Sequence, residues 1–213
     1  RDFMGRAEGD SGVVVETPTG KNYELGVKDD GTIVWEDTAD GSIINAPSSS
    51  SSYSAVSVKD FGAKGDGVTD DATAINNAIT SLSGQGGGVL RFDGDTYLIS
   101  SAIKMKSNVT LMGVPNKTTI LTSVSNTDAI RFEELTHNTE INGFIIRSVQ
   151  GINEDFQNGG VYYGHNETIN SIIRNVSFQS FCVGIDARTW WKASLVENVH
   201  FNNCRVSINV EQE

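Results

Sequence analysis

Three aspartates near the start of the chain are the first residues whose spacing could support chemistry. Asp66, Asp70 and Asp71 lie within the segment FGAKGDGVTDD, residues 61–71. Carboxylates in such a group could bind a metal ion or exchange protons with a substrate. The same residue types also build turns and helix starts, because glycine permits left-handed backbone and a Thr or Asp side chain accepts hydrogen bonds from free helix N–H groups. We favour turn and cap roles for the six residues of this motif, which are Gly65, Asp66, Gly67, Thr69, Asp70 and Asp71.

The other acidic residues form no recognisable pair. Hydrolysis of a glycosidic bond needs two carboxylates roughly 5–10 Å apart, whereas the acids of the repeat region are scattered. No two of Glu167, Asp186 and Glu197 share an obvious position in the repeat. The three histidines are isolated and lack the spacing of metal ligands. We therefore assign no catalytic residue and expect no metal and no cofactor. The acids considered are Asp128, Glu133, Glu134, Glu140, Glu154, Asp155, Glu167, Asp186 and Glu197.

An aromatic pair offers a different chemistry. Trp190 and Trp191 stand beside Arg188 and Lys192. Aromatic faces stack against sugar rings, and the flanking cations could hold a saccharide chain. The alternative is that one Trp packs on a neighbouring part of the same fold or on another subunit. We keep Trp190, Trp191 and Arg188 as candidate sugar contacts.

A short amphipathic helix is predicted directly after the aspartates, near residues 70–82. Ile75, Ala78, Ile79 and Leu82 follow the i, i+3, i+4, i+7 spacing of one apolar helix face. Gly84 supplies a stop. A glycine-rich run and a hydrophobic strand, GQGGGVLRF, come next.

This order of turn, helix, glycine-rich run and strand resembles the N-terminal motif of the pectate-lyase-like proteins. They are right-handed parallel β-helices, common in phage tailspikes and in polysaccharide-degrading enzymes. The resemblance implies that the helix plugs the open N-terminal end of a solenoid. The family often has a proline in the turn before Thr96-Tyr97, where this chain has Asp93-Gly94-Asp95, and Gly94 still permits the turn.

Weak internal repeats agree with a solenoid. Residues 141–146, 173–178 and 196–201 align with one another. A second column is predicted from residues 129–130, 160–161, 184–185 and 205–206. Inward Ile, Val and Phe from successive coils would stack into one core, and the insert at 150–159 is expected as a surface loop. The fold class predicted is an all-β right-handed parallel β-helix over residues 56–213.

Two further segments precede the solenoid. Residues 1–45 carry ten acidic and four basic residues and alternate like three strands of a small β-meander, similar to one seen in phage tail proteins. Residues 46–55 contain five consecutive serines and are predicted to be a flexible linker. The solenoid stops in mid-strand, which leaves an open core. We therefore expect the sequence to be the front part of a longer protein.

Cys182 and Cys204 are separated by close to the length of one coil. Stacked coils place equivalent Cα atoms about 4.8 Å apart, which a disulfide tolerates. The alternative, which we favour, is a pair of buried thiols.

Charge and composition exclude several partner classes. The formal net charge is −11, which argues against nucleic acid and against anionic membrane surfaces. No run of about 18 apolar residues is present, so no transmembrane helix is expected.

The resemblance implies a function at the surface of a phage. The chain would be the N-terminal part of a trimeric tailspike in the virion, with residues 1–45 joining phage tail or baseplate proteins. The β-helix would bind host capsule or O-antigen polysaccharide, with or without depolymerising it. The full-length protein is expected to be a depolymerase and residues 1–213 alone to be inactive. The alternatives are a secreted bacterial polysaccharide lyase or glycoside hydrolase of the same fold, and a structural adaptor with no sugar role.

Overall fold

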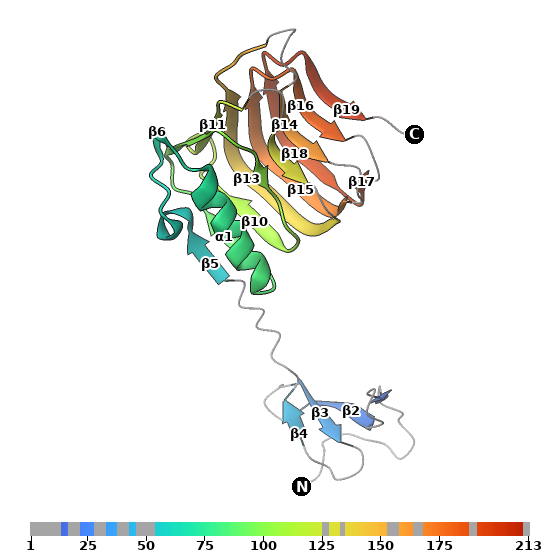
Figure 1. The fold of residues 1–213 in the computed structure, drawn as a ribbon. Coiled ribbons are helices and arrows are strands. Elements are labelled where there is room, and N and C mark those ends of the chain that lie inside the picture. The colour runs from blue at the N-terminus through green and yellow to red at the C-terminus, as the bar shows by residue number, and fades with distance from the viewer. Residues whose placement is uncertain are drawn as a thin grey trace. The chain divides into compact units, whose positions relative to one another are not determined.

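The chain divides into two units, residues 1–52 and 53–213. Figure 1 shows a computed structural model of both. The structure describes the backbone of four strands in the first unit. In the second unit it describes residues 54–124, 128–132, 135–152, 158–163, 168–187 and 191–210, with the side chains of 191 and 192 left out.

The first unit contains an antiparallel β-meander. Its sheet has the order β1-β2-β3-β4. The three strands predicted in residues 1–45 are present as β1, β2 and β3. The fourth strand, β4, was not predicted and is only three residues long. The strands are β1 (Val14–Glu16), β2 (Asn22–Val27), β3 (Ile33–Asp37) and β4 (Ile43–Asn45).

The second unit is the predicted right-handed parallel β-helix. All described strand pairs in it are parallel. Ten strands form a sheet that bends within its longest members. They are β5 (Ser54–Ser57), β6 (Asp66–Asp70), β7 (Gly88–Arg91), β8 (Thr96–Ile99), β10 (Val109–Met112), β11 (Thr119–Thr122), β13 (Thr136–Ser148), β15 (Thr168–Gln179), β17 (Trp191–Lys192) and β18 (Leu195–Asn202).

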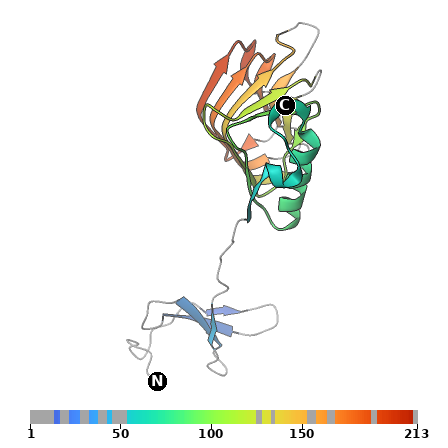
Figure 2. The ribbon, with the colours of Figure 1, turned by 90° about the vertical axis from the view of Figure 1, so that its left-hand side faces the viewer.

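A separate five-stranded sheet completes the coils. Its order is β19-β16-β14-β12-β9. Figure 2 shows the strands of successive coils stacked on one another, with the helix α1 at the end where the coils begin. The members of this sheet are β9 (Ile103–Lys104), β12 (Asp128–Phe132), β14 (Gly159–Tyr163), β16 (Val183–Ala187) and β19 (Val206–Val210).

Strand register confirms the first predicted column of repeats. Ile141 pairs with Ile173, which pairs with Val196, so the three aligned segments occupy the same position on successive coils. Between the paired segments, Gly143, Asn175 and Asn198 have φ of 84°, 54° and 49°. Gly and Asn adopt this left-handed backbone at low cost, and the chain bends there on every coil.

The second predicted column is right in three members and wrong in the fourth. Ile130, Val161 and Ile185 are in register. The next residue in register is Ile208 rather than Val206, which pairs with Val183. The length of the last coil decides the register, whereas the sequence alignment placed the last segment two positions early.

The helix α1 (Ala72–Gly84) covers the first coil. It begins two residues later than predicted, because Thr69 and Asp70 belong to β6. The four predicted apolar positions and Ala72 are at most 1% exposed, and they join the core of the solenoid. A short 3-10 helix, η1 (Val58–Phe61), packs beside it.

The cysteines are thiols, buried at Cys182 and half-buried at Cys204, and no disulfide joins them. Phe181 and Cys182 each accept a backbone hydrogen bond, from Arg205 and Val206. Cys204 therefore lies one position out of register with Cys182. Such an offset turns alternate side chains to opposite faces, so the two thiols do not meet although their spacing is close to that of a coil. Among the described residues, no helix has the length and apolar character needed to cross a membrane.

Candidate functional site

The carboxylate of Asp71 organises the turn before the helix. Asp71 is 1% exposed and accepts hydrogen bonds from the backbone N–H groups of Lys64, at 2.7 Å, and Gly65, at 3.0 Å. It occupies the N-cap position of α1 but makes no side-chain cap hydrogen bond. Asp70 reaches the helix instead, accepting from the Ala72 N–H at 3.1 Å.

Asp66 closes its own small turn. Its carboxylate accepts from the N–H groups of Val68 and Thr69 and from the Thr69 hydroxyl, at 2.7–2.9 Å. These hydrogen bonds, led by that from the Thr69 N–H, lower the pKa of Asp66 to about 2. Thr69 thus serves Asp66 and does not cap α1. Gly65 and Gly67 hold the turn open with φ of 68° and 73°.

Asp70 also ties the helix start to the second coil. Partial burial raises the pKa of Asp70, but hydrogen bonds from Ser100 and the Ala72 N–H outweigh burial and leave the pKa below its ordinary value. All three aspartates are thus acceptors within the fold. In the described part of the chain, no three His, Cys, Asp or Glu side chains are grouped as metal ligands.

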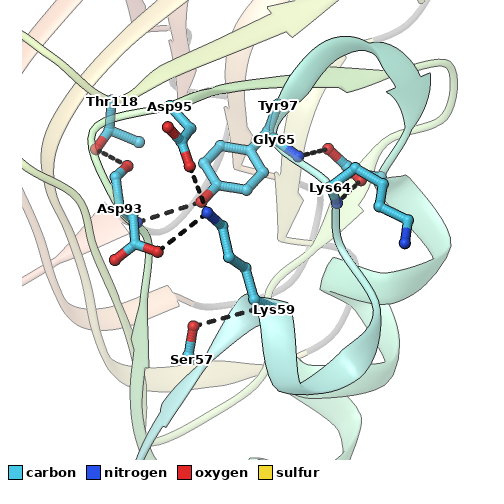
Figure 3. A network of polar contacts seen from close by, with 9 residues as sticks. Ser57, Lys59, Lys64, Gly65, Asp93, Asp95, Tyr97 and Thr118 are labelled. Atoms are coloured by element: carbon cyan, nitrogen blue, oxygen red, sulfur yellow. Dashed lines mark hydrogen bonds and ion pairs between the residues drawn. The ribbon is translucent and has the colours of Figure 1, made fainter.

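A lysine that the sequence analysis did not consider links η1 to the turn before β8. Figure 3 shows the Lys59 ammonium between Asp95, at 2.6 Å, and Asp93, at 3.4 Å. The hydrogen bond to Asp95 raises the pKa of Lys59. Asp93 donates its N–H to the Tyr97 hydroxyl at 3.2 Å, and its carbonyl accepts from Thr118 at 2.6 Å. The cluster therefore joins η1, the turn before β8 and Thr118 on the next coil.

A different arrangement faces outward from the five-stranded sheet. One residue from each strand forms a row in register. Each directly follows a member of a column in which Ile103, Ile130, Val161 and Ile185 are buried and Ile208, on the last described coil, is 41% exposed. Because successive strand residues point to opposite faces, the row points away from the core. We call this the outward row, and its members are Lys104, Arg131, Tyr162, Asp186 and Asn209.

Neighbours within the outward row interact. The Arg131 guanidinium carbon lies 4.6 Å from the centre of the Tyr162 ring, a distance at which the ring attracts a cation. The same guanidinium lies 3.3 Å from the Asp128 carboxylate. Asn209 donates to the Asp186 carboxylate at 2.9 Å. Asp186 is 4% exposed, whereas Lys104 is exposed and Arg131, Tyr162 and Asn209 are half-buried. A ligand can therefore reach these four members of the row.

The outward row could have been found from the sequence. Its three central members directly follow Ile130, Val161 and Ile185, which the predicted column contained. Asn209 could not be found in this way, because the sequence alignment placed the fourth segment of that column two positions too early.

The predicted sugar contacts are not tested by the structure. Arg188 and Trp190 lie outside the described residues, and only the backbone of Trp191 is described, paired with Thr168 in β17. Arg188 follows Asp186 of the outward row by two residues.

The acids Asp186 and Glu197 do not form a pair. Asp186 belongs to the five-stranded sheet and Glu197 to the ten-stranded sheet, next to Arg174. Glu167 lies outside the described residues.

Comparison with known proteins identifies the family. Residues 55–162 match the family described as rhamnogalacturonase A/epimerase, pectate lyase-like. The chain belongs to this family. The match covers the aspartate-containing segment 61–71, the helix α1, the glycine-rich run after it and the first coils. It includes Lys104, Arg131 and Tyr162 of the outward row.

Curated relatives include a bacterial binding protein and a phage protein. Plasmin and fibronectin-binding protein A of Streptococcus pneumoniae is 43% identical over 72 residues, 33% of this chain and 10% of that protein. The preneck appendage protein of Bacillus phage PZA is 41% identical over 66 residues, 31% of this chain and 7% of that protein. The chain therefore spans about a tenth or less of these relatives.

A solved tailspike shares the fold. The tailspike of E. coli bacteriophage HK620, determined in complex with a pentasaccharide, superposes with a TM-score of 0.58 at 18% identity. The superposition covers 68% of this chain and 30% of the tailspike chain.

Proposed function

We propose that this chain is the N-terminal part of a phage tailspike or receptor-binding protein whose β-helix binds a host surface polysaccharide. The observation that carries the proposal is the outward row. Its cation, phenol, carboxylate and amide follow one another at the spacing of strands, about 4.8 Å. Polysaccharides are polymers of hydroxyl-rich rings, and a few placed polar groups beside an aromatic ring are the usual means of orienting such a ligand.

The charge of the outward row favours a ligand that is not strongly acidic. Arg131 is already matched by Asp128 at 3.3 Å, and Asp186 stands two strands away from it. The cationic members, Lys104 and Arg131, are thus balanced by two carboxylates. Such a surface provides donors and acceptors without a net field, which suits the hydroxyl groups of capsule or O-antigen sugars.

Family membership and the tailspike fold support the phage assignment. We propose that residues 1–45 attach the spike to the phage tail or baseplate. The linker predicted at 46–55 ends before Ser54, because Ser54 and Ala55 belong to β5. The protein would act in the virion as a homotrimer of closed threefold symmetry, the arrangement expected of a spike. Light scattering at micromolar concentration checks this assembly, and a stable monomer would contradict it.

Polysaccharide cleavage is proposed for the full-length protein and not for residues 1–213. The second candidate function is a secreted bacterial lyase or hydrolase, which the rhamnogalacturonase and epimerase names in the family description favour.

A glycan array of capsular and O-antigen polysaccharides tests the binding proposal directly. Arg131→Ala should weaken binding about tenfold or more, because hydrogen bonds to a charged group contribute about 1.5–3 kcal/mol. Arg147→Ala is the matched control, since Arg147 is exposed on the ten-stranded sheet. Circular dichroism verifies that both variants are folded.

The outcomes test the outward row and separate polysaccharide binding from a purely structural role. Loss in Arg131→Ala but not in Arg147→Ala supports the outward row as the binding site. Equal binding by all three proteins removes the row from the site. Failure of the folded chain to bind any polysaccharide on the array favours a structural adaptor.

A further inference from the structure

Arg131 of the outward row is held by two neighbours, one on its own strand and one on the next. Its Nη1 donates a hydrogen bond to the Oδ2 of Asp128 at 3.3 Å. Its guanidinium carbon lies 4.6 Å from the centre of the Tyr162 ring, on β14. A carboxylate and an aromatic ring together restrict where the guanidinium can point.

The position of Asp128 depends on a glycine of the neighbouring strand. Asp128 is in register with Gly159, and its Oδ1 occupies the space that a side chain at Gly159 would fill. A Cβ atom there would overlap Oδ1 and lie 3.0 Å from the Cγ of Asp128, which is closer than an ordinary contact between carbon atoms. The Asp128 side chain is only 14% exposed, so the glycine provides the space in which a shielded carboxylate sits.

Gly159 is needed for this space and not for its backbone freedom. Its φ lies outside the left-handed region, and it belongs to β14, where other residues adopt the same extended backbone. The three atoms nearest to a Cβ at this position all belong to Asp128. A side chain at Gly159 would therefore act first on the Asp128 carboxylate.

The carboxylate of Asp128 decides what Arg131 can offer to a ligand. A guanidinium without a partner binds a carboxylate through two parallel hydrogen bonds. With Asp128 already at Nη1, a second carboxylate would lie within a few ångströms of the first and be repelled. A neutral hydroxyl group accepts a hydrogen bond from a guanidinium N–H without that repulsion. Because 29% of the Arg131 side chain is exposed, it remains within reach of a ligand.

We propose that Asp128 determines the specificity of the outward row and that Gly159 positions it. The pair makes the row select neutral saccharides and reject saccharides that carry carboxylates, such as uronic acids. This selectivity rests on the proposed binding of polysaccharide at the outward row. Both are positioning residues, because they act through the charge and the orientation of Arg131.

An array of paired glycans tests the selectivity. Each acidic polysaccharide is placed beside its carboxyl-reduced form, in which every uronic acid has become a neutral sugar. Binding of the full chain is measured at about 0.15 M salt, which screens the exposed charge of Lys104. The wild type should bind the reduced member of a pair more tightly than the acidic member.

Three variants separate the roles of the two residues. Asp128→Asn keeps the shape of the side chain and removes its charge, so the ratio of acidic to reduced binding should rise about tenfold or more. Gly159→Ala should also raise this ratio, because it displaces the carboxylate. The double variant should match Asp128→Asn, since the glycine acts through the carboxylate.

Two matched controls should leave the ratio unchanged. Glu197→Gln removes a carboxylate that is exposed on the ten-stranded sheet, and it therefore controls for net charge. Gly84→Ala controls for replacement of a glycine, because no atom lies within 4 Å of a Cβ at that position. Circular dichroism verifies that every variant is folded.

A second measurement needs no bound polysaccharide. The NMR signal of the Arg131 Nε–Hε group, assigned by its loss in Arg131→Ala, is followed while free glucuronate or glucose is added. Glucuronate should shift this signal about twice as far or further in Asp128→Asn as in the wild type, because the guanidinium is then open to an anion. Glucose should shift it equally in both proteins.

The two measurements distinguish failure of the selectivity from failure of the proposed function. Binding of polysaccharide with a ratio that Asp128→Asn leaves unchanged, or with a wild-type preference for the acidic member, would overturn the selectivity alone. If no variant binds either member of any pair, the proposed function fails, and the glucuronate titration decides whether Asp128 shields Arg131. Equal glucuronate shifts in the wild type and Asp128→Asn would overturn the role of Asp128 in either case.

Discussion

The side chain of Asn76, on α1, accepts a 2.8 Å hydrogen bond from the backbone N–H of Lys104. The same side chain donates to the carbonyl of Ala102 at 3.0 Å. Lys104 and Ala102 flank Ile103 of β9, the first strand of the five-stranded sheet. One carboxamide thus replaces two hydrogen bonds that a preceding strand would make. The helix closes the solenoid with polar groups as well as with its apolar face.

Replacing Asn76 should therefore destabilise the fold. Asn76→Ala leaves a backbone donor and acceptor without their protein partner, which costs about 1–3 kcal/mol when the site stays dry. Urea unfolding measures the difference. Asn77→Ala is the control, because Asn77 is exposed on the next helix position. Equal stability of the two variants would contradict a closing role for Asn76.

The apolar face of α1 carries a larger share of stability. Ile75 and Ile79 are both 0% exposed, so Ile75→Ala and Ile79→Ala should each lower the unfolding free energy by about 2–5 kcal/mol. Thr80, exposed on the same helix, provides the control as Thr80→Ala. If urea melts of the isoleucine variants show losses below about 0.5 kcal/mol, which is the range of ordinary surface substitutions, the helix is not the plug.

The turn aspartate should make stability depend on acid pH. The pKa of Asp66 is lowered from 3.8 to about 2, so its ionised form stabilises the folded state at pH values above the unfolded pKa. That contribution is lost as the pH falls from about 4 through about 2. The unfolding free energy of the wild type minus that of Asp66→Asn should therefore decline across this window. A constant difference, or a pKa near its ordinary value by NMR titration, would contradict the turn geometry.

A single alanine breaks an asparagine ladder and offers a stabilising change. Asn138 donates to Asn108, and Asn170 donates to Asn138, all three at φ of 55–62°. The next position in register is Ala193, at φ of 50°.

Ala193→Asn should raise the unfolding free energy by about 0.5–1.5 kcal/mol, because asparagine relieves the left-handed strain and adds a rung. Ala193→Gly relieves the strain without adding a rung and should gain less. Ala193→Val should destabilise. Thermal melts of the three variants rank them, and a gain in the valine variant would contradict the assigned backbone.

Residues 1–213 should not cleave polysaccharide. Asp186 and Glu197 lie in different sheets, so they do not flank one bond as a hydrolase requires. Reducing-end release, or absorbance of an unsaturated product, from host capsule incubated with the chain should stay at background. Turnover that Asp186→Asn or Glu197→Gln abolishes would place an active site in these first coils. Asp70→Ala should instead cost about 0.5–2 kcal/mol of stability through the helix start.

Local patterns in the sequence determined the turn motif at residues 61–71, the helix α1 and the bends of the coils. The apolar positions Ile75, Ala78, Ile79 and Leu82 are spaced for one helix face, and the same four are buried. Gly143, Asn175 and Asn198 mark bends because few other residues adopt left-handed backbone. Such signals act over a few residues and can be read without knowing what lies on the neighbouring coil.

Only the tertiary structure decided which residues of different coils meet. Register is set by hydrogen bonds between coils, and coils differ in length, because Ile141, Ile173 and Val196 are unequally spaced in the sequence yet equivalent in register. The last segment of the second predicted column lies two positions later than the alignment placed it, at Ile208. Cys182 and Cys204 do not meet, because they are one position out of register. The Lys59–Asp95 contact and the outward row of Arg131, Tyr162 and Asp186 arise from the same stacking. The sequence by itself thus specified a capped solenoid, and the stacking of its coils specified the surface that a ligand would meet.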